Sequence, residues 1–176
     1  SYRGLCETTA VDTTRRTSRT YYYGSVQEEV AFYTITYRAG GTIVKGTTYN
    51  YYDHFDPVLD QRQLVRASLA SVEDGLRMTS METPTRVTET WYESRKASPA
   101  EVNEKGYEVV DYGHTYAVSQ ETGARTLMNR TDYFYTYGAN TDLTAIDVAY
   151  VDDSPMNRSE TTKYLYVSGV LAGTYL

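Results

Sequence analysis

Histidines 54 and 114 are the only imidazoles in the chain, so a hydrolytic triad would need one of them beside a nucleophile and an orienting acid. His114 lies in the alternating segment EVVDYGHTYAV, which places it on one face with Tyr112 and Tyr116 and favours a packing role. No G-x-S-x-G nucleophile elbow occurs. The sequence therefore predicts that the protein is not an enzyme.

The segment YYDHFDP brings together Asp53, His54 and Asp56, whose oxygen and imidazole ligands are able to hold a divalent cation. Two further acids, residues 152–153, lie far along the chain. The spacing matches no metal-binding loop, and Asp56 before Pro57 is better explained as the N-cap of a helix. The sequence also contains no P-loop, no dinucleotide fingerprint and no zinc spacing. We therefore expect no metal and no cofactor.

A basic and aromatic segment, TTRRTSRTYYYGS, lies near the start of the chain. Its candidate interface residues are Arg15, Arg16, Arg19, Tyr21, Tyr22 and Tyr23. The segment has no helix cap and tolerates extended structure, so residues 1–23 are predicted to form an extended arm. Its arginines suit nucleic acid or an acidic surface, but the chain as a whole carries a net charge of −6, which disfavours nucleic acid as a partner. We expect the arm to add as a strand to a second copy of the chain.

Composition favours a folded, β-rich and self-associating chain. The sequence has 20 Tyr but only 3 Phe, and the many threonines and tyrosines prefer extended structure. Tyrosine rings supply the apolar area that a thin aliphatic content lacks, and they are enriched at the cores of protein interfaces. A homo-oligomer is the leading expectation, and a monomer with a tyrosine-studded exterior is the alternative.

Alternation of polar and apolar residues predicts most of the elements. Residues 30–52 read as a long hairpin that turns at Gly40 and Gly41, and residues 85–93 as a strand with Trp91 in the core. Helices are predicted over residues 56–75, from the spacing of Val65, Leu69, Val72 and Leu76, and over residues 98–106. Further strands are predicted over residues 107–119, 125–137, 143–151 and 161–171.

The short gaps between these strands favour antiparallel pairing. The predicted fold is mainly β, an antiparallel β-sandwich or open barrel of about seven to nine strands with one or two short helices. Residues 1–23 form the arm, and residues 24–176 form a single β-rich domain. No apolar run of 18 residues exists, so no membrane span is expected.

Two sequons make glycans candidate partners. Asn157 lies in a predicted loop and is the better acceptor, whereas Asn129 lies within a predicted strand and is usable only if it is exposed. The single cysteine, Cys6, excludes an internal disulfide. It is expected to be a small buried hydrophobe, with an intermolecular disulfide as the alternative.

We expect a secreted structural subunit of an extracellular filament, tube or surface assembly that polymerises through strand addition and tyrosine-rich contacts. The start at Ser1 fits a removed leader peptide or an edited start. One alternative is a small-molecule-binding β-barrel lined by Tyr112, Tyr116, Tyr133 and Tyr135. Another is a viral or phage structural protein, for which a basic arm on an acidic body is a known pattern.

Overall fold

A computed structural model describes residues 16–93, 105–148, 154–167 and 170–175. These residues form strands and one short helix. The strands are β1 (Ser18–Tyr23), β2 (Val30–Tyr37), β3 (Val44–Asp56), β4 (Gln61–Arg66), β5 (Leu76–Glu82), β6 (Arg86–Glu93), β7 (Val109–Val118), β8 (Arg125–Tyr137), β9 (Asn140–Leu143), β10 (Met156–Val167) and β11 (Val170–Tyr175). The helix is α1 (Ala145–Val148).

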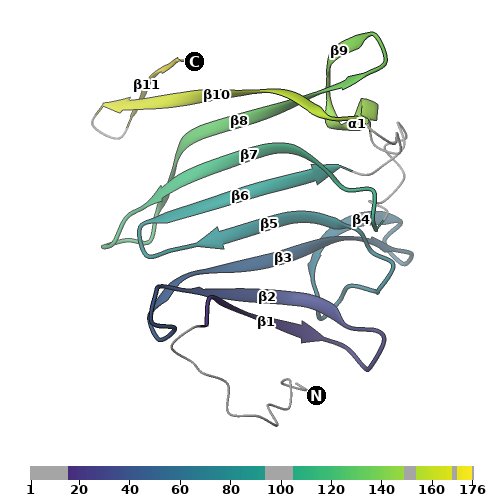
Figure 1. Ribbon diagram of the computed structural model, residues 1–176. Helices are drawn as coiled ribbons and strands as arrows, with labels where there is room; N and C mark the ends of the chain where they lie inside the picture. The colour runs from purple at the N-terminus through teal and green to yellow at the C-terminus, as the bar shows by residue number, and fades with distance from the viewer. Residues whose placement is uncertain (1–15, 94–104, 149–153, 168–169, 176) are drawn as a thin grey trace.

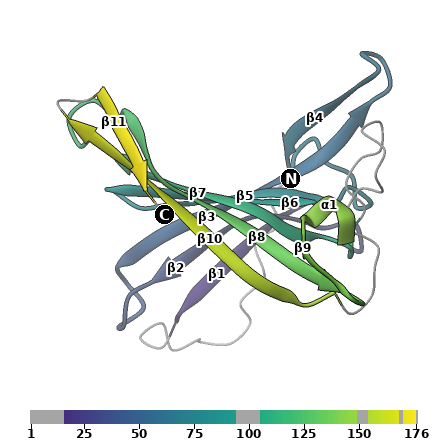
Figure 2. The ribbon, with the colours of Figure 1, turned by 90° about the horizontal axis from the view of Figure 1, so that it is seen from above.

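All eleven strands belong to one antiparallel sheet in the order β1-β2-β3-β5-β6-β7-β8-β10-β11, with β4 paired to β3 and β9 to β8. Figures 1 and 2 show this sheet as one open, twisted layer with β1 and β11 at its two ends. The prediction of a mainly β, antiparallel fold is confirmed. The sandwich or barrel of seven to nine strands is not what the structure has. The path from β1 to β11 passes over β4 and β9, and within the described residues it neither closes nor folds onto a second sheet.

The two faces of the sheet differ most clearly in β1, β2 and β3: one face carries Tyr21, Tyr33 and Tyr49 and is called the ring face, and the other carries Thr20, Thr34 and Thr48 and is called the threonine face. One row on the ring face runs in register from β1 to β10 through Tyr21, Tyr33, Tyr49, Ser80, Glu89, His114, Arg130 and Thr162. One row on the threonine face runs from β1 to β11 through Thr20, Thr34, Thr48, Met81, Thr88, Thr115, Asn129, Lys163 and Tyr175. Period-two alternation explains why a chain rich in both residue types suits a single sheet.

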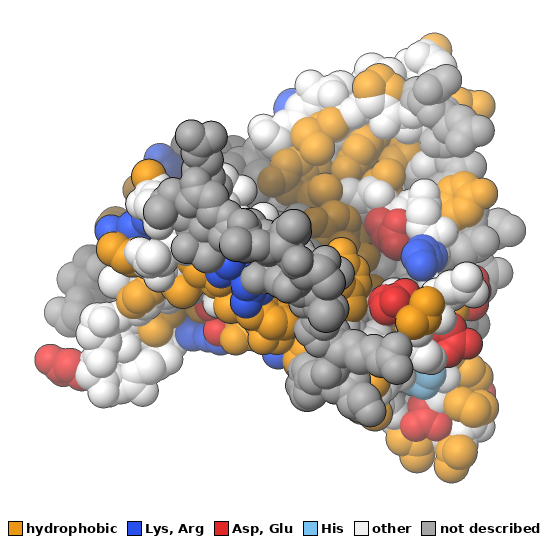
Figure 3. Space-filling view, turned by 60° about the horizontal axis from the view of Figure 1, so that its bottom comes forward, with side chains coloured by type: hydrophobic (Ala, Val, Ile, Leu, Met, Phe, Trp, Pro, Cys, Tyr) orange, Lys and Arg blue, Asp and Glu red, His pale blue; other side chains and the backbone are white. Residues whose placement is uncertain are grey.

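Buried apolar side chains form two separate clusters. The first cluster joins Val30, Tyr52, Val65 and Ala67 beside β2, β3 and β4. The second cluster, formed by Tyr135, Ala145 and Val148, lies where α1 covers β8. In the view of Figure 3, hydrophobic side chains line a hollow in the middle of the molecule and charged side chains gather around it. The fold is therefore held by two local clusters together with the ladder of the sheet.

The predicted helix over residues 56–75 is wrong. The Asp56 carboxylate does accept backbone bonds, from Val58 N at 2.9 Å and Leu59 N at 3.2 Å, but it stabilises a turn between β3 and β4. Asp60 follows with a φ of 50° and completes the reversal. The helical spacing of apolar residues was misleading, because Val65 is buried in a strand while Leu69 is 68% exposed.

The predicted strand over residues 143–151 is also wrong in its described part, since β9 ends at Leu143 and α1 begins at Ala145. The Thr144 hydroxyl and amide both donate to the Asp147 carboxylate, at 2.6 and 2.9 Å. This exchange resembles a capping box and starts the helix. It lets Ala145 and Val148, both nearly inaccessible, turn onto the sheet.

Several other predictions are confirmed. Gly40 and Gly41 form the turn between β2 and β3 with φ values of 97° and 68°. Strands occupy 86–93, 109–118 and 125–137, close to the predicted ranges, whereas the predicted strand 161–171 is split into β10 and β11. The prediction that Trp91 lies in the core is wrong, because this side chain is half-buried on the ring face of an open sheet and belongs to neither core cluster. The predicted helix over 98–106 lies mostly outside the described residues.

Candidate functional site

The edge strand β1 is tied to the chain's own sheet by its side chains. Tyr21 stacks on Tyr33 with ring centroids 4.6 Å apart, and Tyr33 in turn contacts Tyr49 at 5.9 Å. The Arg19 guanidinium lies 5.9 Å from the Tyr21 ring, and the Arg16 guanidinium lies 5.6 Å from the Tyr37 ring. Residues 18–23, expected as part of the arm, thus form the first strand of this sheet.

The outer side of β1 presents backbone groups for pairing. Tyr37 N donates to Thr17 O at 2.9 Å, and this pair shares its register with the pairing of Arg19 opposite Ile35. Because backbone groups alternate in direction along a strand, Ser18 and Thr20 turn theirs away from β2. Among the described residues no strand pairs with this side.

The opposite edge, β11, is exposed along its whole length. Its sequence VLAGTY has no charged residue, and each of its side chains is solvent-exposed. Val170 is 70% exposed, and Leu171 and Tyr175 are more than half exposed. Within the described part of the chain, β10 is the only strand that pairs with it. An uncharged, exposed edge strand is a template for adding another strand.

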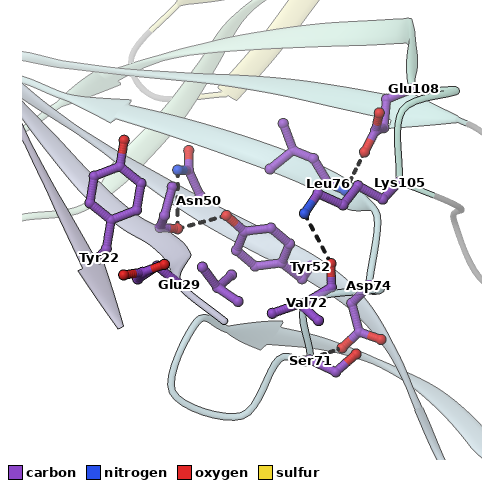
Figure 4. Close-up of a pocket in the computed structure, with 12 residues that line it drawn as sticks. Tyr22, Glu29, Asn50, Tyr52, Ser71, Val72, Asp74, Leu76, Lys105 and Glu108 are labelled. Carbon is purple, nitrogen blue, oxygen red and sulfur yellow. Dashed lines mark hydrogen bonds between the residues drawn. The ribbon is translucent and has the colours of Figure 1, made fainter. Parts of the chain in front are cut away.

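A pocket of about 340 Å³ lies beside β1. Apolar groups on its wall come from Val30, Val72, Leu76 and the Tyr52 ring, three of which are labelled in Figure 4. Its polar wall consists of Tyr22, Glu29, Asn50, Ser71, Asp74, Lys105 and Glu108. Apolar walls with a few polar groups are the usual lining of a small-ligand site.

Hydrogen bonds hold the pocket's polar groups in place. The Tyr52 hydroxyl donates to Ala31 O at 2.7 Å, and Asn50 Nδ2 donates to the same oxygen at 3.2 Å. Glu108 accepts from Leu76 N at 3.0 Å and from Gly106 N at 2.7 Å, which ties two distant segments together. Burial raises the pKa of Tyr52 to about 12, so this phenol stays protonated at neutral pH.

Lys105 and Asp74 stand on the pocket wall with partners of their own. Lys105 Nζ donates to Val72 O at 3.1 Å. Asp74 accepts from Ser71 N at 2.8 Å and contacts His54 Nδ1 at 2.9 Å. These contacts hold the wall of the pocket in shape. The Asp74 and Glu108 carboxylates and the Lys105 ammonium all line the pocket.

The ring face carries charged groups around its aromatic rings. His114 lies 5.0 Å from the Tyr112 ring and contacts the Tyr116 hydroxyl at 3.2 Å, which agrees with the packing role predicted for it. Burial, with the nearby Arg130, lowers the pKa of His114. Burial also raises the pKa of Asp111, which lies on the adjacent stretch of β7. The ring face is therefore an aromatic surface with charged groups dispersed over it.

Asp53, His54 and Asp56, weighed in the sequence as metal ligands, have different partners. Asp53 is 3% exposed and pairs with Arg62. His54 contacts Asp74, whereas Asp56 holds the turn. Among the described residues no three His, Cys, Asp or Glu side chains converge as metal ligands would. The acids 152–153, Arg15 and Cys6 lie outside the described residues.

The four tyrosines proposed to line a barrel do not share one interior. Tyr112 lies opposite Asp132 on the ring face, and alternation along β8 then sends Tyr133 to the other face. Tyr133 contacts the cluster that contains Tyr135 beneath α1. Their separation follows from the open sheet, which has no enclosed lumen to line.

The two sequons lie on strands with different exposure. Asn157 belongs to β10 rather than a loop and is exposed beside a register shift in the pairing with β8. Asn129 lies in β8, half-buried between Thr115 and Lys163. Asn157 is therefore the more exposed of the two sequon asparagines.

Sequence reasoning found the β1 residues but missed the pocket and the β11 edge. The pocket residues come from segments as far apart as Tyr22 and Glu108, and only the pairing of β1, β2 and β3 brings them together. The β11 edge could have been predicted from the tail KYLYVSGVLAGTYL. This tail has one charged side chain, and its central Ser-Gly pair is a sequence signal for a turn between two strands.

Comparisons of the chain with known protein families, with curated proteins and with solved structures found no match. No helix in the described part of the chain has the length and apolar content that crossing a membrane requires. Function therefore has to be argued from the sheet and its surfaces.

Proposed function

We propose that the protein is a secreted structural subunit of an extracellular filament, tube or surface assembly, and that it has no enzymatic role. The observation that carries this proposal is the open sheet, since no other described strand pairs with the outer side of β1 or of β11. Backbone groups on an open edge gain hydrogen bonds when another strand is added. A single sheet with two such edges is able to bind a neighbour on each side, which is the requirement for a polymer.

The interface residues named from the sequence suit this role at the β1 edge. Tyr22 is 46% exposed, so its ring is able to contact a neighbouring chain, and Tyr23 beside it is 37% exposed. Arg16, Arg19 and Tyr21 hold β1 against β2. Arg15, the other interface residue named from the sequence, lies outside the described residues. Exposed Asn157 is where a glycan would be tolerated.

Light scattering and electron microscopy of the purified full chain test this proposal. We expect the measured mass to rise with concentration from the 20.0 kDa subunit to higher species, and regular polymers to appear on grids. Deleting residues 1–23 is expected to weaken this association. A chain that stays at one-subunit mass up to millimolar concentration would refute the proposal.

A second candidate function is binding of a small ligand in the 340 Å³ pocket beside β1, which replaces the barrel lumen expected from the sequence. The test uses the neutral apolar dye Nile red, whose fluorescence rises on binding. A Val72→Trp variant should fill the pocket and remove this rise, while Val58→Trp, on an 89% exposed side chain, should not. Equal dye response in all three proteins would rule out the pocket as a ligand site.

A further inference from the structure

The direction of the strands restricts how a second copy is able to continue the sheet. Nine strands lie on the path from β1 to β11, and each of the eight pairings between them is antiparallel. An even number of reversals means that β1 and β11 run in the same direction. A translated copy would therefore place its β1 parallel to β11, a pairing that is slightly less stable per residue.

The two faces impose a second restriction. Turning the second copy over would make β1 antiparallel to β11, but the ring face of one copy would then continue into the threonine face of the next. The rows Tyr21-Tyr33-Tyr49 and Thr20-Thr34-Thr48 show how different these faces are. Rotation about an axis perpendicular to the sheet avoids both problems, because it joins like edges in antiparallel pairing and keeps each face on its own side.

Of the two edges, β11 is better suited to such a contact. Its side chains are uncharged and exposed on both faces, with Leu171 and Thr174 on one face and Val170 and Tyr175 on the other. Two copies of an uncharged strand meet without like-charge repulsion. In β1, a two-fold contact would bring the Arg19 residues of both copies, and the arginines before them, toward one another.

We infer that β11 pairs with β11 of a second copy in an antiparallel, two-fold contact that joins two sheets into one. This inference rests on the proposed function, since it names the contact through which a polymer would begin. Contacts of the same kind at β1 would then link these dimers into an open ribbon. The partner is a second copy of this chain, and the contact buries Val170, Leu171 and Tyr175.

Paired charge variants of the full chain test the inference. Leu171→Lys/Thr174→Lys and Leu171→Asp/Thr174→Asp should each lose the two-subunit species, because like charges face each other across the two-fold axis. A one-to-one mixture should restore it, since opposite charges then meet. The matched control is Ser18→Lys/Tyr23→Lys, which places two charges on the β1 edge and should leave the two-subunit species in place. Mass is read by light scattering and folding by circular dichroism.

The outcomes separate this inference from the proposed function. If the wild type associates but the charge variants associate equally, or if their mixture stays at one-subunit mass, the β11 contact is wrong while the proposed function survives. If the wild type itself never associates, both are wrong. Should the charge variants fail to fold, Leu171→Cys/Thr174→Cys in a Cys6→Ser background replaces them, because the charge variants test a pairing in which these two positions of different copies face each other. Oxidation of this variant to a disulfide-linked dimer supports the contact. If the variant folds and associates as the wild type does but forms no crosslink, the contact is wrong.

Discussion

β1 and β11 end the same sheet, but they are attached to it in different ways. β1 is half-buried, its Tyr21 ring lies in a stack with Tyr33, and a buried cluster around Tyr52 lies beside it. β11 has only exposed side chains, and no described side chain of β10 is buried either. Side-chain packing holds β1 against the sheet, and arginines lie beside it. β11 is held mainly by its backbone hydrogen bonds to β10.

The difference bears on stability and on association separately. Side chains that pack within the chain stabilise the fold, whereas uncharged side chains that remain exposed at an edge favour contact with another chain. We therefore assign most of the stability of the described fold to the β1 side and to the cluster under α1. The β11 edge is assigned to association.

Replacing a tyrosine by alanine in the buried cluster near β1 and in β11 should give the largest contrast in the free energy of unfolding. Tyr52 is 9% exposed, so Tyr52→Ala removes a buried ring and should lower the free energy of unfolding by about 3–5 kcal/mol. Tyr175 is 53% exposed, and Tyr175→Ala should change it by about 0.5 kcal/mol or less. Urea unfolding of dilute protein measures both. Similar losses in the two variants would contradict the contrast.

Alkaline pH should test the two buried clusters together. Burial raises the pKa of both Tyr52 and Tyr135 from 10.0 to about 12. The native state then holds these protons more tightly than the unfolded state, so their stabilising contribution is complete below pH 10 and is lost as the pH rises through about 12.

We therefore expect the urea midpoint to fall between about pH 10 and 12, more steeply in the wild type than in Tyr52→Phe or Tyr135→Phe. Tyrosinate absorbance followed in the same samples reports the titration itself. An unchanged slope in both phenylalanine variants would show that these two hydroxyls do not carry the effect.

Removing a charge from the β1 edge should make this edge associate more readily, as is proposed for β11. Arg19→Thr takes away the guanidinium near Tyr21 and leaves a β-compatible side chain, so association should strengthen by at most about fivefold. Sedimentation equilibrium measures the change, and Arg38→Thr, in the loop before β3, serves as the control. A weaker association of Arg19→Thr would mean that the arginine binds the neighbour instead of repelling it.

The smallest expected effect concerns hydrogen bonds between threonines near the two edges. Thr20 contacts Thr34 and Thr131 contacts Thr161, each through hydroxyl oxygens 2.9 Å apart. Thr20→Val and Thr161→Val should each cost about 0.2–1 kcal/mol, because valine keeps the strand preference and loses only the bond. Amide hydrogen exchange should become faster only in the strand that carries the substitution and in the strand paired with it. Faster exchange in the middle strands would point to a wider role.

The strands were predictable where two signals agreed. Alternation and the Gly40-Gly41 turn predicted the β2–β3 hairpin, and the structure places β8 over the predicted range 125–137. The helix over 56–75 failed because an aspartate before proline serves a turn as well as a helix. At α1 the error was the reverse, because a strand was predicted where the structure has a helix. The Thr144 and Asp147 pair that caps this helix was present in the sequence, but the alternating pattern was given more weight.

The candidate sites depended on knowledge that local patterns do not contain. The sequence predicted antiparallel strands, but whether they close, stack or remain open depends on packing between distant segments. Because the sheet is open, no second described strand pairs with β11, and Tyr22 and Glu108 line the same pocket. The arginines and tyrosines of the N-terminal segment could be proposed from the sequence, because that proposal rests on residue type alone.

Hydrogen exchange of the full chain at increasing concentration tests the central claim most directly, because edge pairing protects backbone amides that are otherwise open to water. The account predicts that amides of Val170–Tyr175 become protected as concentration rises, while those of the middle strands β5–β7 keep the protection they have in dilute protein. Exchange at β11 that stays the same over the range in which the mass increases would contradict it.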